Sequence, residues 1–232
     1  YCMELTPDMV YAFCEEATKL YRLRHPHVVC THGVCIVPPS LCIVMELCPN
    51  GSLFDYLRKN DSRLGWGRRL RLCADCADGL AFLHSRQVLH MDVKSLNFLV
   101  DAHGVAKVCD LGSSKAGASA DAMDNFSPPW VAPEVLDGKP FTHRSDVYSL
   151  AIVFWEIATG KAPYEDGALR VRSIKDARRL VLGAGLRPVM PDAPAGFKAL
   201  LARAWSADPE ERPAAAEMRD CVLGIIERAQ RR

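Results

Sequence analysis

The chain has 232 residues, of which 49% are hydrophobic and 25% are charged. This length and composition can bury the core of one large domain or of two modest lobes, so intrinsic disorder is not the default expectation. Its 29 basic and 28 acidic residues give a formal net charge of +1. Charge therefore gives no reason to expect a nucleic acid or an acidic membrane as the main partner.

No run of about 18 apolar residues predicts a membrane span, and the N-terminus has no basic segment followed by an apolar one. The ten cysteines are scattered through apolar patterns that indicate a core, so we expect reduced thiols and a cytoplasmic protein. The pair Cys73 and Cys76 lies in an amphipathic pattern and favours core packing over a metal site. Because the chain begins with Tyr1 and not with Met, we expect it to be part of a longer protein.

The first part of the chain predicts one helix and two strands. Apolar residues recur at helical spacing over residues 6–24, and His25-Pro26 ends the pattern. Two β-rich runs follow over residues 28–37 and 41–47, separated by a Pro-Pro-Ser turn. We expect these two strands to be antiparallel neighbours.

The remainder of the chain is predicted to be mainly helical. Short strand-like pieces are expected at residues 88–100 and 105–109, and residues 112–129 have no periodicity and indicate a mobile loop. The expected helices are residues 53–58, 68–84, 145–159, 174–182, 197–206 and 214–228.

Three short motifs follow one another in an informative order. Residues 90–97 read HMDVKSLN, residues 110–112 read DLG and residues 132–134 read APE. Together they resemble the catalytic loop, the metal-binding triplet and the end of the activation segment of protein kinases. The resemblance covers nearly the whole chain and is closest to the tyrosine-kinase-like serine/threonine group, which includes mixed-lineage and plant-type kinases.

This resemblance implies an α+β, two-lobed protein kinase fold with a truncated small lobe, residues 1–47, and a mainly helical large lobe, residues 48–232. It also implies transfer of the γ-phosphate of ATP to Ser or Thr hydroxyls of protein substrates. Phosphoryl transfer leaves the protein mainly the tasks of positioning the hydroxyl and neutralising charge.

The resemblance assigns those tasks to four residues. Asp92 would accept or orient the proton of the substrate hydroxyl, and Lys94 would neutralise the γ-phosphate. Asn97 and Asp110 would hold Mg²⁺ through oxygen ligands. A lysine at the position of Lys94 accompanies serine/threonine kinases in this family, so it favours Ser and Thr acceptors.

Adenine recognition is implied for the run that ends the second predicted strand. The backbone groups of Glu46 and Cys48 would face the adenine edge, Leu99 would pack beneath the ring, and Met45 would be the bulky residue at the back. A buried strand would have the same apolar pattern, so only the context makes this assignment specific.

Several further residues are expected to be structural. His90 and Leu111 would link the lobes as core residues, and Asp146 would accept backbone hydrogen bonds from the catalytic loop. Glu134 and Arg212 would form a buried ion pair. Ser127 stands where the family has a threonine that bonds the catalytic aspartate.

The sequence also departs from the family pattern. No Gly-rich loop and no Val-Ala-x-Lys motif precede the first helix, so Glu16, or the adjacent Glu15, lacks the lysine with which it would pair. Met91 replaces the usual arginine that contacts a phosphorylated activation loop. Two explanations stay open: a fragment of an active kinase, or a pseudokinase that acts as a scaffold and binds partners without catalysis.

Overall fold

The computed structural model describes residues 7–36, 41–111, 127–165 and 169–231. Its first elements are helix α1, Pro7–Arg22, and the antiparallel strands β1, Thr31–Cys35, and β2, Cys42–Met45. These confirm the helix and the two neighbouring strands that the sequence predicts. The predicted Pro-Pro-Ser turn and most of the predicted loop at 112–129 lie outside the described residues.

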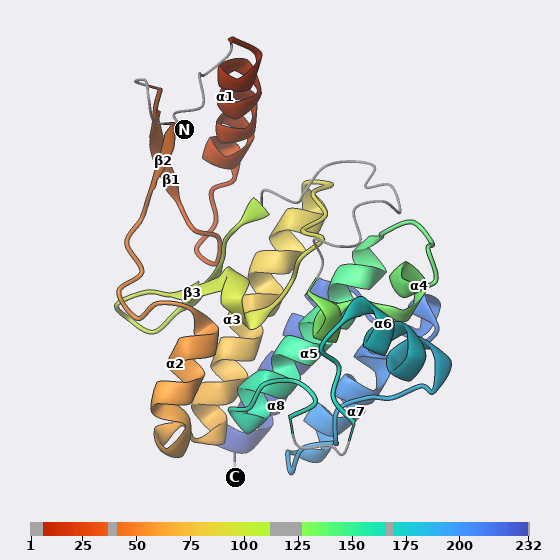
Figure 1. Ribbon diagram of the computed structural model, residues 1–232. Helices are drawn as coiled ribbons and strands as arrows, with labels where there is room; N and C mark the ends of the chain where they lie inside the picture. The colour runs from red at the N-terminus through yellow and green to blue at the C-terminus, as the bar shows by residue number, and fades with distance from the viewer. Residues whose placement is uncertain (1–6, 37–40, 112–126, 166–168, 232) are drawn as a thin grey trace.

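Helices make up most of the rest of the described chain, as the apolar periodicity predicts (Figure 1). The bounds of five of these helices lie within a few residues of the expected ones, and the short helix at Pro133–Leu136 was not predicted. The helices are α2 Leu53–Asn60, α3 Trp66–Ser85, α4 Pro133–Leu136, α5 His143–Thr159, α6 Ile174–Ala177, α7 Ala195–Ala204 and α8 Ala215–Gln230.

Two predictions need correction. The strand expected over 88–100 is only β3, Phe98–Val100, which pairs with β4, Ala106–Val108. The residues before β3 form a loop that ends in a 3-10 turn, Ser95–Asn97. The helix expected over 174–182 is α6 followed by a π-helical turn, Arg178–Gly183. An apolar run marks a buried segment, but it does not show which hydrogen-bonding pattern that segment adopts.

Local capping sets the start and end of the central helix α5. The Thr142 hydroxyl accepts a hydrogen bond from the Arg144 N–H, and the Ser145 hydroxyl accepts one from the Thr142 N–H. Gly160 ends the helix with a φ of 70°, a left-handed conformation that glycine adopts without steric cost. Almost all of α5 between these ends is buried, so this helix forms the centre of the core.

Helix α3 packs against α5 and α8 in the helical body of the molecule (Figure 1). Its buried residues include Cys73 and Cys76, both fully enclosed, and burial raises the pKa of each thiol well above the ordinary value. This pair packs in the core, as predicted. No described helix is long and apolar enough to span a bilayer.

The segment before β1 packs on α3 and forms backbone hydrogen bonds with β4. The Val29 N–H donates to the Val108 carbonyl, and the Val108 N–H donates to the His27 carbonyl, each at 2.9 Å. Gly79 on α3 lies so close to His27 that an added Cβ would overlap the His27 carbonyl oxygen. The absence of a side chain at Gly79 therefore permits this docking.

Candidate active site

Asp146 on α5 holds the backbone of the predicted catalytic loop. Its Oδ2 accepts a hydrogen bond from the His90 N–H and its Oδ1 accepts one from the Met91 N–H, both at 2.9 Å. The Asp146 side chain is fully buried, and this arrangement confirms the role expected for it. Met91 has a φ of 67°, an unfavourable conformation for a residue with a side chain, and these bonds fix it there.

The carboxylate of Asp92 is the centre of a polar cluster. Lys94 Nζ lies 2.5 Å from Asp92 Oδ2, and Asn97 Nδ2 donates to the same oxygen at 2.9 Å. The Ser127 hydroxyl donates to Asp92 Oδ1 at 3.1 Å and accepts a hydrogen bond from Lys94 Nζ at 2.9 Å. The expected contact of Ser127 with the aspartate is confirmed, and the cluster links the predicted catalytic loop to the chain at Ser127.

The residue before Asp110, Cys109, connects it to this cluster by a hydrogen bond to Asn97. The Cys109 N–H donates to the Asn97 carbonyl at 2.9 Å, and the Cys109 carbonyl lies 3.0 Å from His90 Nε2. Asp110 itself is exposed and has a φ of 58°, a conformation that aspartate tolerates better than most residues. Its exposed side chain follows directly after the residue that is hydrogen-bonded to Asn97.

A cavity of about 290 Å³ lies between α1, the β1–β2 sheet and the β3–β4 pair. Asp110, Leu99 and Met45 line it, together with apolar side chains that include Val28 and Ile43. An apolar cavity with one carboxylate at its edge suits a ligand that has a flat apolar part and a charged part.

Glu46 and Cys48 do not line this cavity. The Glu46 carboxylate accepts hydrogen bonds from Lys107 Nζ and from the Cys30 N–H, both at 2.6 Å, and so ties β2 to β4. Burial opposes the charge of Lys107, but the hydrogen bond and charge of Glu46 raise its pKa. Cys48 is buried, and burial raises the pKa of its thiol. The Glu46 N–H donates to the Cys30 carbonyl and the Cys48 carbonyl accepts from the Gly51 N–H, so the Glu46 carbonyl and the Cys48 N–H are the backbone groups left for recognising a ligand.

The predicted ion pair between Glu134 and Arg212 is confirmed. Two parallel hydrogen bonds of 2.8 Å join the guanidinium to the two carboxylate oxygens, and both side chains are buried. Burial disfavours the charge of Glu134, but Arg212, with help from the Ser145 hydroxyl, lowers its pKa below the ordinary value. The pair connects α4 to the segment before α8.

Glu156 on α5 is a site residue that the sequence did not reveal. The Ser95 hydroxyl donates to its Oε1 at 2.6 Å and Trp130 Nε1 donates to its Oε2 at 2.8 Å. Burial raises the pKa of Glu156 to about 8, although both hydrogen bonds act in the opposite direction. These contacts join the catalytic loop to the chain just after Ser127. No local spacing signals them, because the partners are far apart in the sequence.

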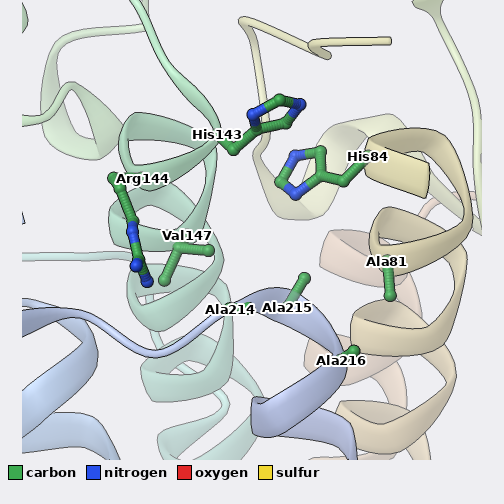
Figure 2. Close-up of a pocket in the computed structure, with 8 residues that line it drawn as sticks. All are labelled: Ala81, His84, His143, Arg144, Val147, Ala214, Ala215 and Ala216. Atoms are coloured by element: carbon green, nitrogen blue, oxygen red, sulfur yellow. The ribbon is translucent and has the colours of Figure 1, made fainter. Parts of the chain in front are cut away.

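A second cavity, of about 260 Å³, lies between α3, α5 and the start of α8 (Figure 2). His84 and His143 face each other at its upper edge in Figure 2, with ring centroids 4.5 Å apart. His84 Nε2 lies 2.9 Å from Asp146 Oδ2, so this histidine supports the residue that holds the catalytic loop. Burial, followed by the neighbouring His84, lowers the pKa of His143.

Comparison with known proteins agrees with this geometry. A family model described as protein tyrosine and serine/threonine kinase matches residues 3–222. Serine/threonine-protein kinase STY46 of Arabidopsis thaliana is 36% identical over 90% of the chain, and serine/threonine-protein kinase CTR1 of the same plant is 35% identical over 96%. Mitogen-activated protein kinase kinase kinase 13 of Mus musculus is 34% identical over 84%. The chain spans 36%, 27% and 20% of these relatives' own lengths.

The chain belongs to the protein tyrosine and serine/threonine kinase family. The relatives confirm its resemblance to serine/threonine kinases of the tyrosine-kinase-like group. The expected α+β kinase fold is confirmed, with a mainly helical large lobe and with α1 and the β1–β2 sheet as the small-lobe elements of the described chain. Kinases of this family use ATP. The side chain of Glu16 lies outside the described residues.

Proposed function

We propose that this site transfers the terminal phosphoryl group of Mg²⁺-ATP to Ser or Thr hydroxyls of protein substrates. The observation that carries the proposal is the cluster around Asp92, in which Lys94, Asn97 and Ser127 all contact one carboxylate. A carboxylate held in this way can accept the hydrogen bond of an incoming hydroxyl and orient its oxygen. Lys94, whose Nζ lies beside the Asp92 carboxylate, would neutralise the charge of the γ-phosphate.

The residues present fit a divalent cation. Asn97 Nδ2 donates to Asp92, which leaves Asn97 Oδ1 as the amide atom able to bind a metal ion. Asp110 adds an exposed carboxylate next to the residue bonded to Asn97. Oxygen atoms of carboxylates and amides are the ligands that Mg²⁺ prefers. When bound, Mg²⁺-ATP would supply the phosphoryl group and the charge that screens it.

The residues of the apolar cavity fit an adenine ring. Leu99 would pack on the ring, and Met45 would close the back of the site. Backbone groups of Glu46 and Cys48 would bind its polar edge, since the Glu46 carboxylate is occupied by Lys107. In this proposal residues 1–47 form the small-lobe side of the site and residues 48–232 form the large-lobe side.

The proposal is tested by measuring phosphate transfer from Mg²⁺-ATP to a generic Ser/Thr protein substrate. The samples are the given chain, the chain with any residues that precede it in its natural sequence, and Asp92→Asn in whichever form is active. We expect transfer that Asp92→Asn abolishes. Transfer that survives Asp92→Asn would remove Asp92 from its role, and no transfer from any form would favour the pseudokinase scaffold.

A further inference from the structure

Cys35 and Cys42 stand directly opposite each other in the β1–β2 ladder, beside α1 at the N-terminal end of the molecule (Figure 1). Both are free thiols; Cys42 is exposed and Cys35 is half-buried. Residues directly opposite in an antiparallel pair project from the same face of the sheet, with Cβ atoms about 4.5–5.5 Å apart. The two thiols therefore share one face of the hairpin and are within reach of each other.

We propose that Cys35 and Cys42 form a reversible disulfide bond in response to a two-electron oxidant such as hydrogen peroxide. A disulfide requires Cα atoms about 4.4–6.8 Å apart, and opposite Cα atoms in an antiparallel ladder lie about 4.5–5.5 Å apart. The Cβ atoms must approach to about 3.5–4.5 Å. Cys35 and Cys42 are the last pair of the ladder, where a small shift disturbs few neighbouring hydrogen bonds.

Exposure to solvent distinguishes this pair from the buried cysteines of the described chain. Cys73 and Cys76 are fully enclosed and Cys48 is buried, and burial raises the pKa of each of these thiols. The thiolate is the reactive form, so a raised pKa and lack of access both suppress oxidation. Cys35 and Cys42 reach solvent, and each has the other as a resolving thiol.

The reaction is balanced with peroxide as the oxidant. One thiol releases its proton, the thiolate attacks a peroxide oxygen and the O–O bond breaks, so that a sulfenic acid forms and the departing hydroxide takes up the proton as water. The second thiol releases its proton, its thiolate attacks the sulfenic sulfur and the S–O bond breaks, so that the S–S bond forms and the departing hydroxide takes up that proton as a second water. The two thiols lose two electrons and two protons, which the peroxide takes up.

The bond would connect β1 to β2 covalently, at the end of the ladder opposite the Thr31–Met45 pair. A cross-link restricts the unfolded chain and so stabilises the folded hairpin. We therefore expect the oxidised protein to melt at a higher temperature and a thiol reductant to reverse the shift. This inference needs no kinase activity, so it stands or falls separately from the proposed function.

The test treats the reduced full chain with hydrogen peroxide, caps the remaining thiols with N-ethylmaleimide and identifies the linked peptides by mass spectrometry after chymotrypsin digestion. Chymotrypsin can cut after Leu41, which separates the two cysteines unless the disulfide joins them. We expect Cys35 and Cys42 to be linked, and the link to be lost in both Cys35→Ser and Cys42→Ser. The control variants Cys30→Ser and Cys48→Ser should keep it.

The proposal is overturned if peroxide leaves Cys35 and Cys42 open to N-ethylmaleimide, or if it links either of them to another cysteine or to a second molecule. Loss of the link in Cys30→Ser, with that variant folded by circular dichroism, would also overturn it. The wild type alone decides the main question, because its measurement does not depend on how a variant folds.

Discussion

The Ser127 hydroxyl donates a hydrogen bond to Asp92 Oδ1 across 3.1 Å, and this contact joins two segments 35 residues apart. Lys94 Nζ reaches the same hydroxyl at 2.9 Å. A change in the chain at Ser127 therefore alters the environment of the Asp92 carboxylate directly.

Replacing Ser127 with Ala should lower kcat while Ser127→Thr, which keeps the hydroxyl, should retain most of the activity. A hydrogen bond to a charged group contributes about 1.5–3 kcal/mol, so we expect a kcat lower by about tenfold or more. Initial rates over a range of ATP and protein substrate concentrations separate kcat from KM. Equal activity of the Ala and wild-type forms would show that the contact has no role in catalysis.

Removing the Asp110 carboxylate should weaken the use of Mg²⁺. Asp110→Asn keeps the size of the side chain but loses the charge that a divalent cation favours. We expect the Mg²⁺ concentration that gives half-maximal transfer to rise by about tenfold or more. Asp101→Asn is the control, since the Asp101 carboxylate accepts hydrogen bonds from the backbone of its own loop. A rise of the same size in both variants would contradict the assignment.

Breaking the Glu134–Arg212 pair from one side should strongly destabilise the fold. Arg212→Met leaves the buried Glu134 carboxylate without its partner, at a cost of about 3–5 kcal/mol in the free energy of unfolding. Glu134→Leu in the same chain removes the stranded charge and should recover part of that loss. Denaturant unfolding of the two single variants and the double variant measures the coupling. Additive losses would show that the two side chains do not act as a pair.

The stability of the protein should fall as the pH rises towards 8 because of Glu156. Its pKa is raised by burial from 4.5 to about 8, so the folded form holds a proton that the unfolded form releases. The contribution is fully present below pH 4.5, declines between these two values and is lost above about 8. Glu156→Gln keeps the shape without the titration.

The free energy of unfolding, measured by denaturant at several pH values between 5 and 9, checks this expectation. As the pH rises, the free energy of unfolding of the wild type should fall relative to that of Glu156→Gln. A difference that stays constant across this range would show that Glu156 is ionised in the folded protein.

The sequence predicted the parts of the site whose residues are close together in the chain or belong to motifs that resemble those of protein kinases. Asp92, Lys94 and Asn97 lie within six positions of one another in a single loop, and the structure places their side chains in contact. The pair Glu134 and Arg212 was predicted across 78 positions only through the resemblance to kinases.

The contacts that were missed join residues with no shared local pattern. Glu156 appeared as one more member of an apolar helix, and its bonds to Ser95 and Trp130 depend on how three segments pack. The strand expected over 88–100 failed for a related reason. The His90 N–H donates its hydrogen bond to the Asp146 side chain and not to a neighbouring strand.

Because Gly79 of α3 lies against the His27 backbone, this position cannot accept a side chain of even one carbon atom without a shift of the neighbouring chain. Alanine is favoured over glycine inside helices by about 1 kcal/mol, so Gly79→Ala would strengthen α3 taken alone. The added methyl would overlap the His27 carbonyl, and that oxygen also accepts the hydrogen bond from the Val108 N–H. Gly79→Ala would thus favour the helix but weaken the attachment of α1 and the β1–β2 hairpin. A choice of stabilising substitutions by helix propensity alone would therefore fail at this residue.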